Sequence, residues 1–356
     1  MDAYYHLRQK LSTHALGAPE REEFDQILRM LFTPEEAELA LHLGFRPQRL
    51  GTIAEKAGRP EGEAGALCES MADKGLVYAY NAHGQMVYAL LPSAPGLFEF
   101  PLMIGAITGV DMERLGQLWV KFYENGWGHE LHGSPTNMAR VFPAEGSIAS
   151  SVTVLPFEEA ARYVENARYL SLANCPCRVS KKACHNPVEV CLGFDYAAKY
   201  LIERKAAKAI TKEEALAILR RSEEAGLVHC ASNTQEKIDY ICNCCSCCCG
   251  ILGAATRLKD TASRPHSNFY STVKAEDCTA CMACVDRCPM GAITVDEVAA
   301  VEAALCIGCG LCASACPTEA IALFRKEETV PPRDHSELLA RVAAEKGRLE
   351  AFTANL

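Results

Sequence analysis

The sequence has no long apolar run, and this absence argues against an integral membrane protein. No segment approaches the roughly 18 consecutive apolar residues of a membrane-spanning helix. The first residues, Met-Asp-Ala-Tyr-Tyr-His-Leu-Arg, contain no apolar signal core. We therefore expect a cytoplasmic protein without a membrane span.

An excess of basic charge and the common nucleotide-binding motifs are also lacking. The 45 Asp and Glu residues outnumber the 36 Lys and Arg residues, and the formal net charge is −9. This balance argues against a general nucleic-acid binder. The sequence contains neither a dinucleotide fingerprint nor a glycine-rich P-loop, so it does not indicate an NAD or flavin site.

Cysteine, in contrast, is abundant, with 20 residues in a chain of 356. The length predicts two to four domains, and 49% hydrophobic with 23% charged residues is typical of a soluble globular protein. Disulfides dominate in short secreted chains, whereas a long chain of this kind uses its cysteines for metal binding.

A cysteine repeat near the C-terminus carries the strongest signal. It reads Cys278-Thr-Ala-Cys281-Met-Ala-Cys284-Val-Asp-Arg-Cys288-Pro289 and again Cys306-Ile-Gly-Cys309-Gly-Leu-Cys312-Ala-Ser-Ala-Cys316-Pro317, with a constant shift of 28. Three thiolates at this spacing can wrap one face of an iron–sulfur cube, while the fourth, followed by proline, serves the other cube. The predicted ligand sets are Cys278, Cys281, Cys284 and Cys316 for one [4Fe–4S] cluster, and Cys306, Cys309, Cys312 and Cys288 for the other.

Over about 55 residues this segment resembles the bacterial two-cluster ferredoxins. The resemblance implies a ferredoxin-like domain, over 268–327, that passes electrons. A disulfide or zinc module is the alternative, because Cys-x-x-Cys also binds zinc. Gly308 and Gly310 are expected to let the backbone approach the cluster. Because low-potential clusters are fragile in oxygen, we expect an anaerobic or microaerobic host.

Residues 33–91 predict three helices and a hairpin, which together resemble a winged helix. Capping signatures at Thr33 and Thr52 start two helices, a third covers 61–74, and strands are expected over 76–80 and 85–90. The unit carries five Lys or Arg and eight Asp or Glu residues, a net charge of −3. Docking or scaffolding is therefore favoured over DNA binding.

The region between this unit and the next cysteines gives weaker signals. Residues 126–135 are rich in turn formers, so an irregular surface loop is expected, and His129, Glu130 and His132 match no metal motif. Residues 152–155 predict a strand.

Eleven further cysteines lie between 175 and 249, of which all except Cys230 are candidate ligands. These candidates are Cys175, Cys177, Cys184, Cys191, Cys242, Cys244, Cys245, Cys247, Cys248 and Cys249. Cys242, Cys245 and Cys248 have the ferredoxin triplet spacing, and the interleaved cysteines allow the run to serve two clusters at once. One to two further clusters are expected, with two favoured and about sixteen irons in total. One structural zinc site with free thiols is the alternative.

Basic and histidine side chains beside these ligands have expected roles as well. Arg178, Lys181 and Lys182 should raise the potential of a nearby cluster, and His185 and His229 are expected to be hydrogen-bonding neighbours rather than ligands.

These patterns predict a multidomain α+β protein with a winged-helix-like N-terminal unit, a cysteine-rich α/β middle domain and a ferredoxin-like C-terminal domain. The expected ranges are 1–91, 92–173 as a connecting α/β region, 174–252, 268–327, and a helical tail over 328–356. The order of segments resembles large multi-cluster ferredoxin-type proteins of anaerobic bacteria. It implies an electron-transfer protein, a subunit or partner of a larger oxidoreductase complex. The alternatives are a reductase with a catalytic cluster within 174–250 and, less favoured, a redox-sensing regulator.

Overall fold

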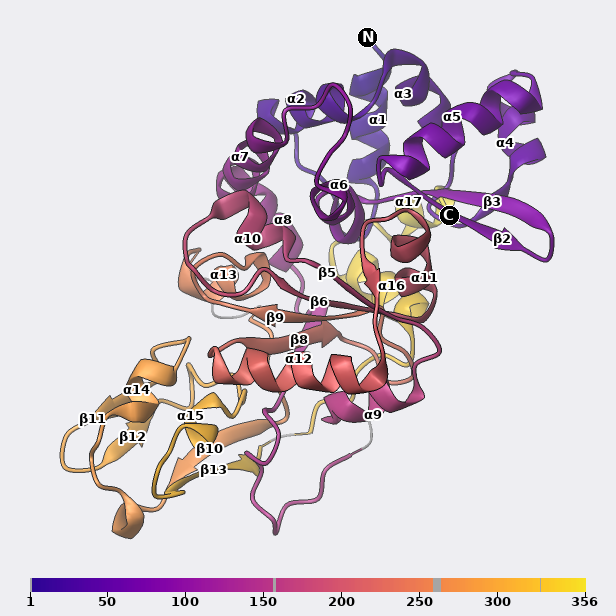
Figure 1. Cartoon of the computed structure of the whole chain (residues 1–356). Helices are drawn as coiled ribbons and strands as arrows, with labels where there is room; N and C mark the ends of the chain where they lie inside the picture. The colour runs from indigo at the N-terminus through magenta and orange to yellow at the C-terminus, as the bar shows by residue number, and fades with distance from the viewer. Residues whose placement is uncertain (1, 156–157, 259–263, 327) are drawn as a thin grey trace.

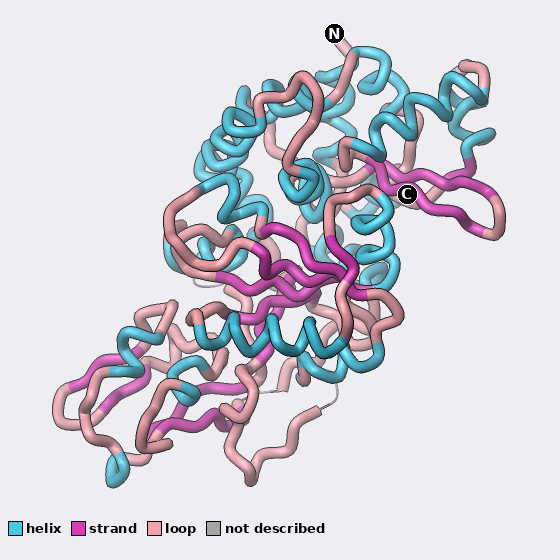
Figure 2. The backbone as a smooth tube through the Cα atoms, viewed as in Figure 1, coloured by secondary structure: helices cyan, strands magenta, loops and turns pink. Residues whose placement is uncertain are grey.

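The computed structural model describes residues 2–155, 158–258, 264–326 and 328–356. Figure 1 shows three parts in chain order: an N-terminal helical unit in indigo and purple, a central sheet with its helices, and a small part in orange. The N-terminal helices and the orange part lie at opposite ends of the central sheet (Figures 1 and 2).

The N-terminal unit combines helices with a three-stranded antiparallel sheet of order β1-β3-β2. Its elements are α1 (Ala3–Ser12), α2 (Glu22–Leu31), α3 (Pro34–Ala40), β1 (Gln48–Arg49), α4 (Leu50–Ala57), α5 (Glu61–Asp73), β2 (Val77–Ala82) and β3 (Gln85–Leu90). The capping box of Thr33 with Glu36 forms as the sequence predicts. The predicted start at Thr52 is wrong, because α4 begins at Leu50. The winged-helix assignment stays a prediction.

An aromatic core joins this unit to the helices that follow it. These are the π-helical turns η1 (Ser93–Leu97) and η2 (Tyr123–Trp127) with α6 (Glu99–Ile104), α7 (Met112–Phe122) and α8 (Gly128–His132). Phe122 stacks on Phe24 of α2 and on Trp127, with ring centroids 4.9 Å and 5.3 Å away. Residues 128–132 form a helix where we expected a loop, and residues 152–155 are not a strand.

The central sheet has six strands in the order β4-β8-β9-β6-β5-β7, with every neighbouring pair antiparallel. Its strands are β4 (Ala139–Phe142), β5 (Leu170–Asn174), β6 (Glu189–Phe194), β7 (Lys208–Ala209), β8 (Val228–Ser232) and β9 (Tyr240–Cys244). The associated helices are α9 (Ala160–Asn166), α10 (Pro176–Lys181), α11 (Asp195–Glu203), α12 (Lys212–Glu224) and α13 (Gly250–Thr256). The sheet takes strands from both sides of residue 173, where we placed a domain boundary.

The two faces of this sheet have different partners because side chains alternate along each strand. Leu192 and Ile241 pack with α9 and α12 on one face (Figure 1). Their strand neighbours Cys191 and Cys242 lie in another apolar cluster, with Met103 of α6 and residues of α11. The cysteines of the strands therefore point toward the N-terminal side of the sheet.

The small C-terminal part contains two antiparallel strand pairs, β10–β13 and β11–β12. Its elements are β10 (Phe269–Val273), the 3-10 helix η4 (Ala275–Asp277), α14 (Ala283–Arg287), β11 (Ile293–Val295), β12 (Ala299–Val301), α15 (Leu311–Ser314) and β13 (Ile321–Arg325). Gly308 has a positive φ of 67°, and a Cβ there would meet the Phe269 carbonyl oxygen at 2.2 Å. Glycine at this position therefore permits close packing on β10.

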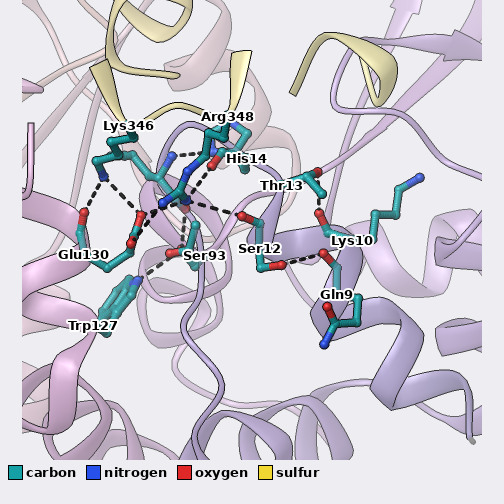
Figure 3. A network of polar contacts seen from close by, with 12 residues as sticks. Gln9, Lys10, Ser12, Thr13, His14, Ser93, Trp127, Glu130, Lys346 and Arg348 are labelled. Carbon is teal, nitrogen blue, oxygen red and sulfur yellow. Dashed lines mark hydrogen bonds and ion pairs between the residues drawn. The ribbon is translucent and has the colours of Figure 1, made fainter. Parts of the chain in front are cut away.

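The tail returns to the N-terminal unit as two helices, α16 (His335–Glu345) and α17 (Leu349–Ala354), in place of the single helix expected. Glu130 of α8 accepts hydrogen bonds of 3.1 Å from both Lys346 and Arg348, as Figure 3 shows. The Phe45 N–H donates to the Asn355 carbonyl over 2.9 Å. The tail thus packs across the protein.

Within the described ranges, no helix combines the length and apolar character needed to cross a membrane.

Candidate metal centres

The cysteines of the C-terminal repeat line two separate small cavities. Cys278, Cys281, Cys284 and Cys316 line one of them, and we call this set the outer quartet. Cys288, Cys306, Cys309 and Cys312 line the other, and we call this set the inner quartet. The grouping is the one that the crossover of fourth ligands predicts, and ligation itself stays a prediction.

Hydrogen-bond donors point at the sulfur atoms of both quartets. The Ala292 N–H donates to Cys288 Sγ over 3.3 Å, and the Ala299 N–H donates to Cys278 Sγ over 3.4 Å. The Ser271 hydroxyl lies 3.1 Å from Cys312 Sγ. Donors directed at sulfur stabilise thiolate ligands and tune a cluster. The residues present therefore fit a pair of iron–sulfur clusters.

The two quartets differ in exposure. In the outer quartet Cys281 is exposed, and the neighbouring Met282 side chain is 52% exposed. In the inner quartet Cys306 and Cys312 are buried. Cys288 and Cys309 of the inner quartet are partly exposed, so the outer quartet is the more accessible of the two to a docking protein.

Residues 277–320 match the 4Fe–4S dicluster domain family. The chain carries a 4Fe–4S dicluster ferredoxin domain near its C-terminus. No match was found among curated proteins or among solved structures. The match covers the repeat and leaves the N-terminal unit and the central sheet to be interpreted from their own geometry.

The ferredoxin domain is held firmly against the central sheet at its inner quartet. The Ala144 N–H donates to the Cys309 carbonyl over 2.9 Å, and Ala149 and Ser147 exchange hydrogen bonds with Leu323 of β13. Ile307 and Cys309 belong to one apolar cluster with four cysteines of the sheet region, which are Cys230, Cys242, Cys244 and Cys249. The inner quartet therefore lies beside a further group of thiols.

That further group contains seven cysteines, linked thiol to thiol. The Sγ atoms of Cys191 and Cys242 lie within hydrogen-bonding distance of each other, and the thiols of the pairs 175–177, 177–249, 249–244, 244–230 and 244–242 shift each other's pKa. We call it the buried thiol group: Cys175, Cys177, Cys191, Cys230, Cys242, Cys244 and Cys249. Hydrogen bonding to the next thiol, and then burial, raises the pKa of Cys175 and of Cys191 well above the usual range.

Strand register explains how distant cysteines meet in this group. Leu192 pairs with Ile241, so the adjacent Cys191 and Cys242 fall side by side, with Sγ atoms 3.8 Å apart. Cys230 pairs directly with Cys242 across β8 and β9. Cys242 and Cys244 share one face because they are two residues apart on a strand.

Arg178 lies near Cys175 and Cys244 of the buried thiol group and also near Cys245. It is 3% exposed and donates to the Pro187 carbonyl over 3.0 Å and to the Asn243 carbonyl over 2.7 Å. Its Nε has no hydrogen-bond partner among the residues that the structure describes. A buried guanidinium with an unused N–H suits anionic thiolates or cluster sulfur. Lys181 and Lys182 instead pair with Glu124 and Glu113, and the effect of all three residues on the potential of a cluster stays a prediction.

Four other cysteines form a tighter set, the thiol quartet: Cys184, Cys245, Cys247 and Cys248. Their sulfur atoms all lie within 4.8 Å of one another. Cys184 comes from the loop after α10, and the other three come from the turn after β9. Burial opposes ionisation of Cys184, but hydrogen bonds from the Asn186 N–H and from neighbouring thiols lower its pKa to about 6.

A large cavity reaches the buried thiol group from the N-terminal side. Its volume is about 510 Å³. All members of the buried thiol group except Cys230 line it, together with aromatic side chains that include Trp127, Phe100 and Tyr240. Glu99 of α6 also faces this cavity and accepts a hydrogen bond of 2.7 Å from the Gly96 N–H. Burial raises the pKa of Glu99 to about 7.

Sequence reasoning found ten of the middle cysteines but grouped them differently. The run 242–249 does divide between two sites, yet the ferredoxin triplet of Cys242, Cys245 and Cys248 is not kept together. Cys230, which we had left out, joins the buried thiol group through its pairing with Cys242. The signal that could have identified it is alternation along residues 228–232, which puts Val228 and Cys230 on the same face of β8. His229 hydrogen bonds to Asn243 and Glu223, as a neighbour rather than a ligand.

Proposed function

We propose that this chain is a multi-cluster iron–sulfur electron-transfer protein, and that it serves as a subunit or partner of an anaerobic redox enzyme complex. Electrons would enter or leave at the outer quartet, pass to the inner quartet, and continue to a cluster held by the buried thiol group. One observation carries the proposal: the inner quartet and the buried thiol group share an apolar cluster, and Cys309 is hydrogen bonded to the sheet region through Ala144.

The chemistry of the donors supports a cluster at the buried thiol group. Seven thiols in one group, four of them on buried residues, are costly as thiolates unless cations compensate them, and a cube needs four cysteines. Arg178 supplies one positive charge at the edge of the network. A third cluster here would extend the path of the ferredoxin domain inward, away from solvent.

The exposed outer quartet supports docking of a redox partner at that end. Cys281 and Met282 are exposed there, and short-range electron exchange requires a cluster near the surface. The N-terminal unit, with its net charge of −3 over 33–91, is proposed as a docking or scaffolding element of the complex.

The test is iron and sulfide analysis of anaerobically purified full-length protein, together with EPR of the reduced state. We expect more than eight irons per chain, with about twelve if the buried thiol group holds one cube. Reduced neighbouring clusters should broaden each other's EPR signals. A protein that binds eight irons and shows signals of an isolated ferredoxin domain would refute an inward path.

The paired variants Cys177→Ser and Cys281→Ser separate the two ends of the path. The first should remove about four irons from the middle region and spare the ferredoxin signals. The second should alter the outer cluster and slow electron uptake from an added reduced ferredoxin, while the middle cluster stays in place.

A second candidate function, a reductase with a catalytic cluster in the middle region, is favoured by the cavity. It offers about 510 Å³ beside the buried thiols, a size that suits a small molecule, and Glu99 faces it as a proton donor. Electrons would come from the ferredoxin clusters and protons from Glu99 and water.

Exogenous small ligands distinguish the two candidates. A catalytic cluster keeps an open iron position, so cyanide or carbon monoxide should shift the EPR signal of the middle cluster in a reductase. A closed cube in an electron path should not respond. The ferredoxin clusters, each with four cysteine ligands, provide the internal control.

A further inference from the structure

The thiol quartet has a geometry of its own within this cysteine-rich chain. Its four sulfur atoms fit within 4.8 Å of one another, and Cys184 Sγ lies 3.7 Å from Cys248 Sγ and 3.9 Å from Cys245 Sγ. Two members are buried and two are partly exposed.

These separations match one tetrahedral ion. With metal–sulfur bonds of about 2.3 Å, the edges of a tetrahedron of thiolates around zinc measure about 3.8 Å. A cube places four irons and four sulfides between its thiolates, so its cysteine sulfurs must stand farther apart. The observed spacing has no room for that core.

The ferredoxin domain provides an internal comparison. Its two quartets each line a cavity, yet across the described ranges the thiol quartet is the one set of three or more metal-ligating groups found within 4.8 Å of one another. Within the described residues, the cysteines of the two ferredoxin quartets are therefore not drawn together as closely as those of the thiol quartet.

We infer that Cys184, Cys245, Cys247 and Cys248 hold a single zinc ion in a closed tetrahedral site. A closed four-cysteine zinc site is structural, because it leaves no position for substrate and zinc does not change oxidation state. This site does not conduct electrons. The inference holds for either function proposed above, and it replaces the second additional cube that the sequence predicts.

The position of the site gives it a structural task. It connects the loop after α10 to the turn after β9. Cys177 of α10, Cys244 at the end of β9 and Cys249 before α13 belong to the buried thiol group and adjoin these two segments. The Asn186 side chain donates to Cys184 Sγ over 3.5 Å, as expected around a ligand sulfur. The ion would fix the turn so that Cys245, Cys247 and Cys248 face the zinc site. The other cysteines of the run then face the buried thiol group.

The first measurement uses wild-type protein produced anaerobically with both iron and zinc supplied. Metal analysis should give one zinc per chain, and zinc K-edge absorption should give four sulfur neighbours at about 2.3 Å without a nearby iron. Because this measurement uses wild-type protein, it does not depend on whether a variant folds. Protein with full iron content and no zinc would overturn the assignment.

The second measurement compares Cys247→Ser with Cys281→Ser as the matched control. Cys247→Ser should lose the zinc and keep the iron content, whereas Cys281→Ser should affect iron and keep the zinc. Loss of about four irons from Cys247→Ser, in a protein whose wild type contains no zinc, would show that the quartet holds a cube. Loss of a single iron would show that the ion is not zinc. Either result would overturn the inference.

Discussion

Arg178 donates a hydrogen bond of 2.7 Å to the backbone carbonyl of Asn243, and this bond joins α10 to β9 between the two groups of middle thiols. Cys177 lies beside the first residue, and Cys242 and Cys244 flank the second. The side chain of Asn243 in turn donates to the Val190 carbonyl over 2.6 Å, next to Cys191. One buried cation therefore positions cysteines from three elements.

Replacing Arg178 should release those cysteines. Arg178→Ala removes two hydrogen bonds and a buried charge, and should cost about 2–3 kcal/mol of stability along with most iron from the middle region. Arg178→Lys keeps the positive charge but lacks the planar guanidinium that donates to both carbonyls. Its loss of stability and of iron should therefore be intermediate. Lys182→Ala should have no effect, because Lys182 pairs with exposed Glu113 over 3.6 Å. Iron analysis and visible circular dichroism would measure the differences.

The ferredoxin ligands should follow the crossover between quartets. Cys316→Ser should damage the outer cluster and leave the inner one, although Cys316 follows the inner cysteines in sequence. Cys288→Ser should damage the inner cluster and so interrupt reduction of the middle region. EPR with freeze-quenched reduction would separate the two variants. An outer cluster lost in Cys288→Ser but kept in Cys316→Ser would contradict the assignment.

Glu99 should make stability fall as pH rises toward neutrality. Burial raises its pKa in the folded state from 4.5 to about 7, so its contribution is fully present below about pH 4.5 and is lost as the pH rises through 7. Glu99→Gln cannot ionise. It should therefore remove a pH-dependent change of up to about 3 kcal/mol in the free energy of unfolding. Thermal unfolding at pH 5 and pH 8 would measure it. Glu113→Gln, at an exposed site, is the matched control.

Glu158 should have the opposite pH dependence. Burial alone would raise its pKa, but hydrogen bonds from Arg325, the Leu155 N–H and Asn268 outweigh burial and hold the pKa below its usual value. Its contribution is therefore present above about pH 4.3 and lost as the pH falls through the lower folded pKa. Glu158→Gln should cost about 3 kcal/mol at pH 7, because it leaves Arg325 without its charged partner. The free energies of unfolding of the wild type and of Glu158→Gln should approach each other at acidic pH.

The ferredoxin domain could be predicted in detail, whereas the middle region could not, for a physical reason. All eight cysteines of the repeat lie in one short segment, so their spacing alone determines the grouping, including the pairing of Cys316 with the first triplet. In the middle region the grouping depends on which strands are neighbours. Cys191 meets Cys242 because β6 pairs with β9 in one register, and a shift of one strand by one residue would place the two thiols on opposite faces of the sheet.

The secondary structure shows the same division between local and long-range signals. The strand over 85–90 and the capping box at Thr33 formed as expected, because their determinants are local. The six-stranded sheet was not anticipated, because β4 and β5 lie far in sequence from β8 and β9. The strand expected at 152–155 has no neighbouring strand to pair with among the residues that the structure describes.

The backbone hydrogen bonds of Ala144, Ser147 and Ala149 to the ferredoxin domain have a consequence for kinetics. A cluster domain on a loose tether must swing between donor and acceptor, and its turnover then slows in viscous solvent. Here the inner quartet is fixed to the sheet, so passage of an electron inward requires no swing. The rate of electron transfer from the inner quartet inward should therefore be insensitive to added glycerol. Glycerol should slow only the collision of an external carrier with the outer quartet.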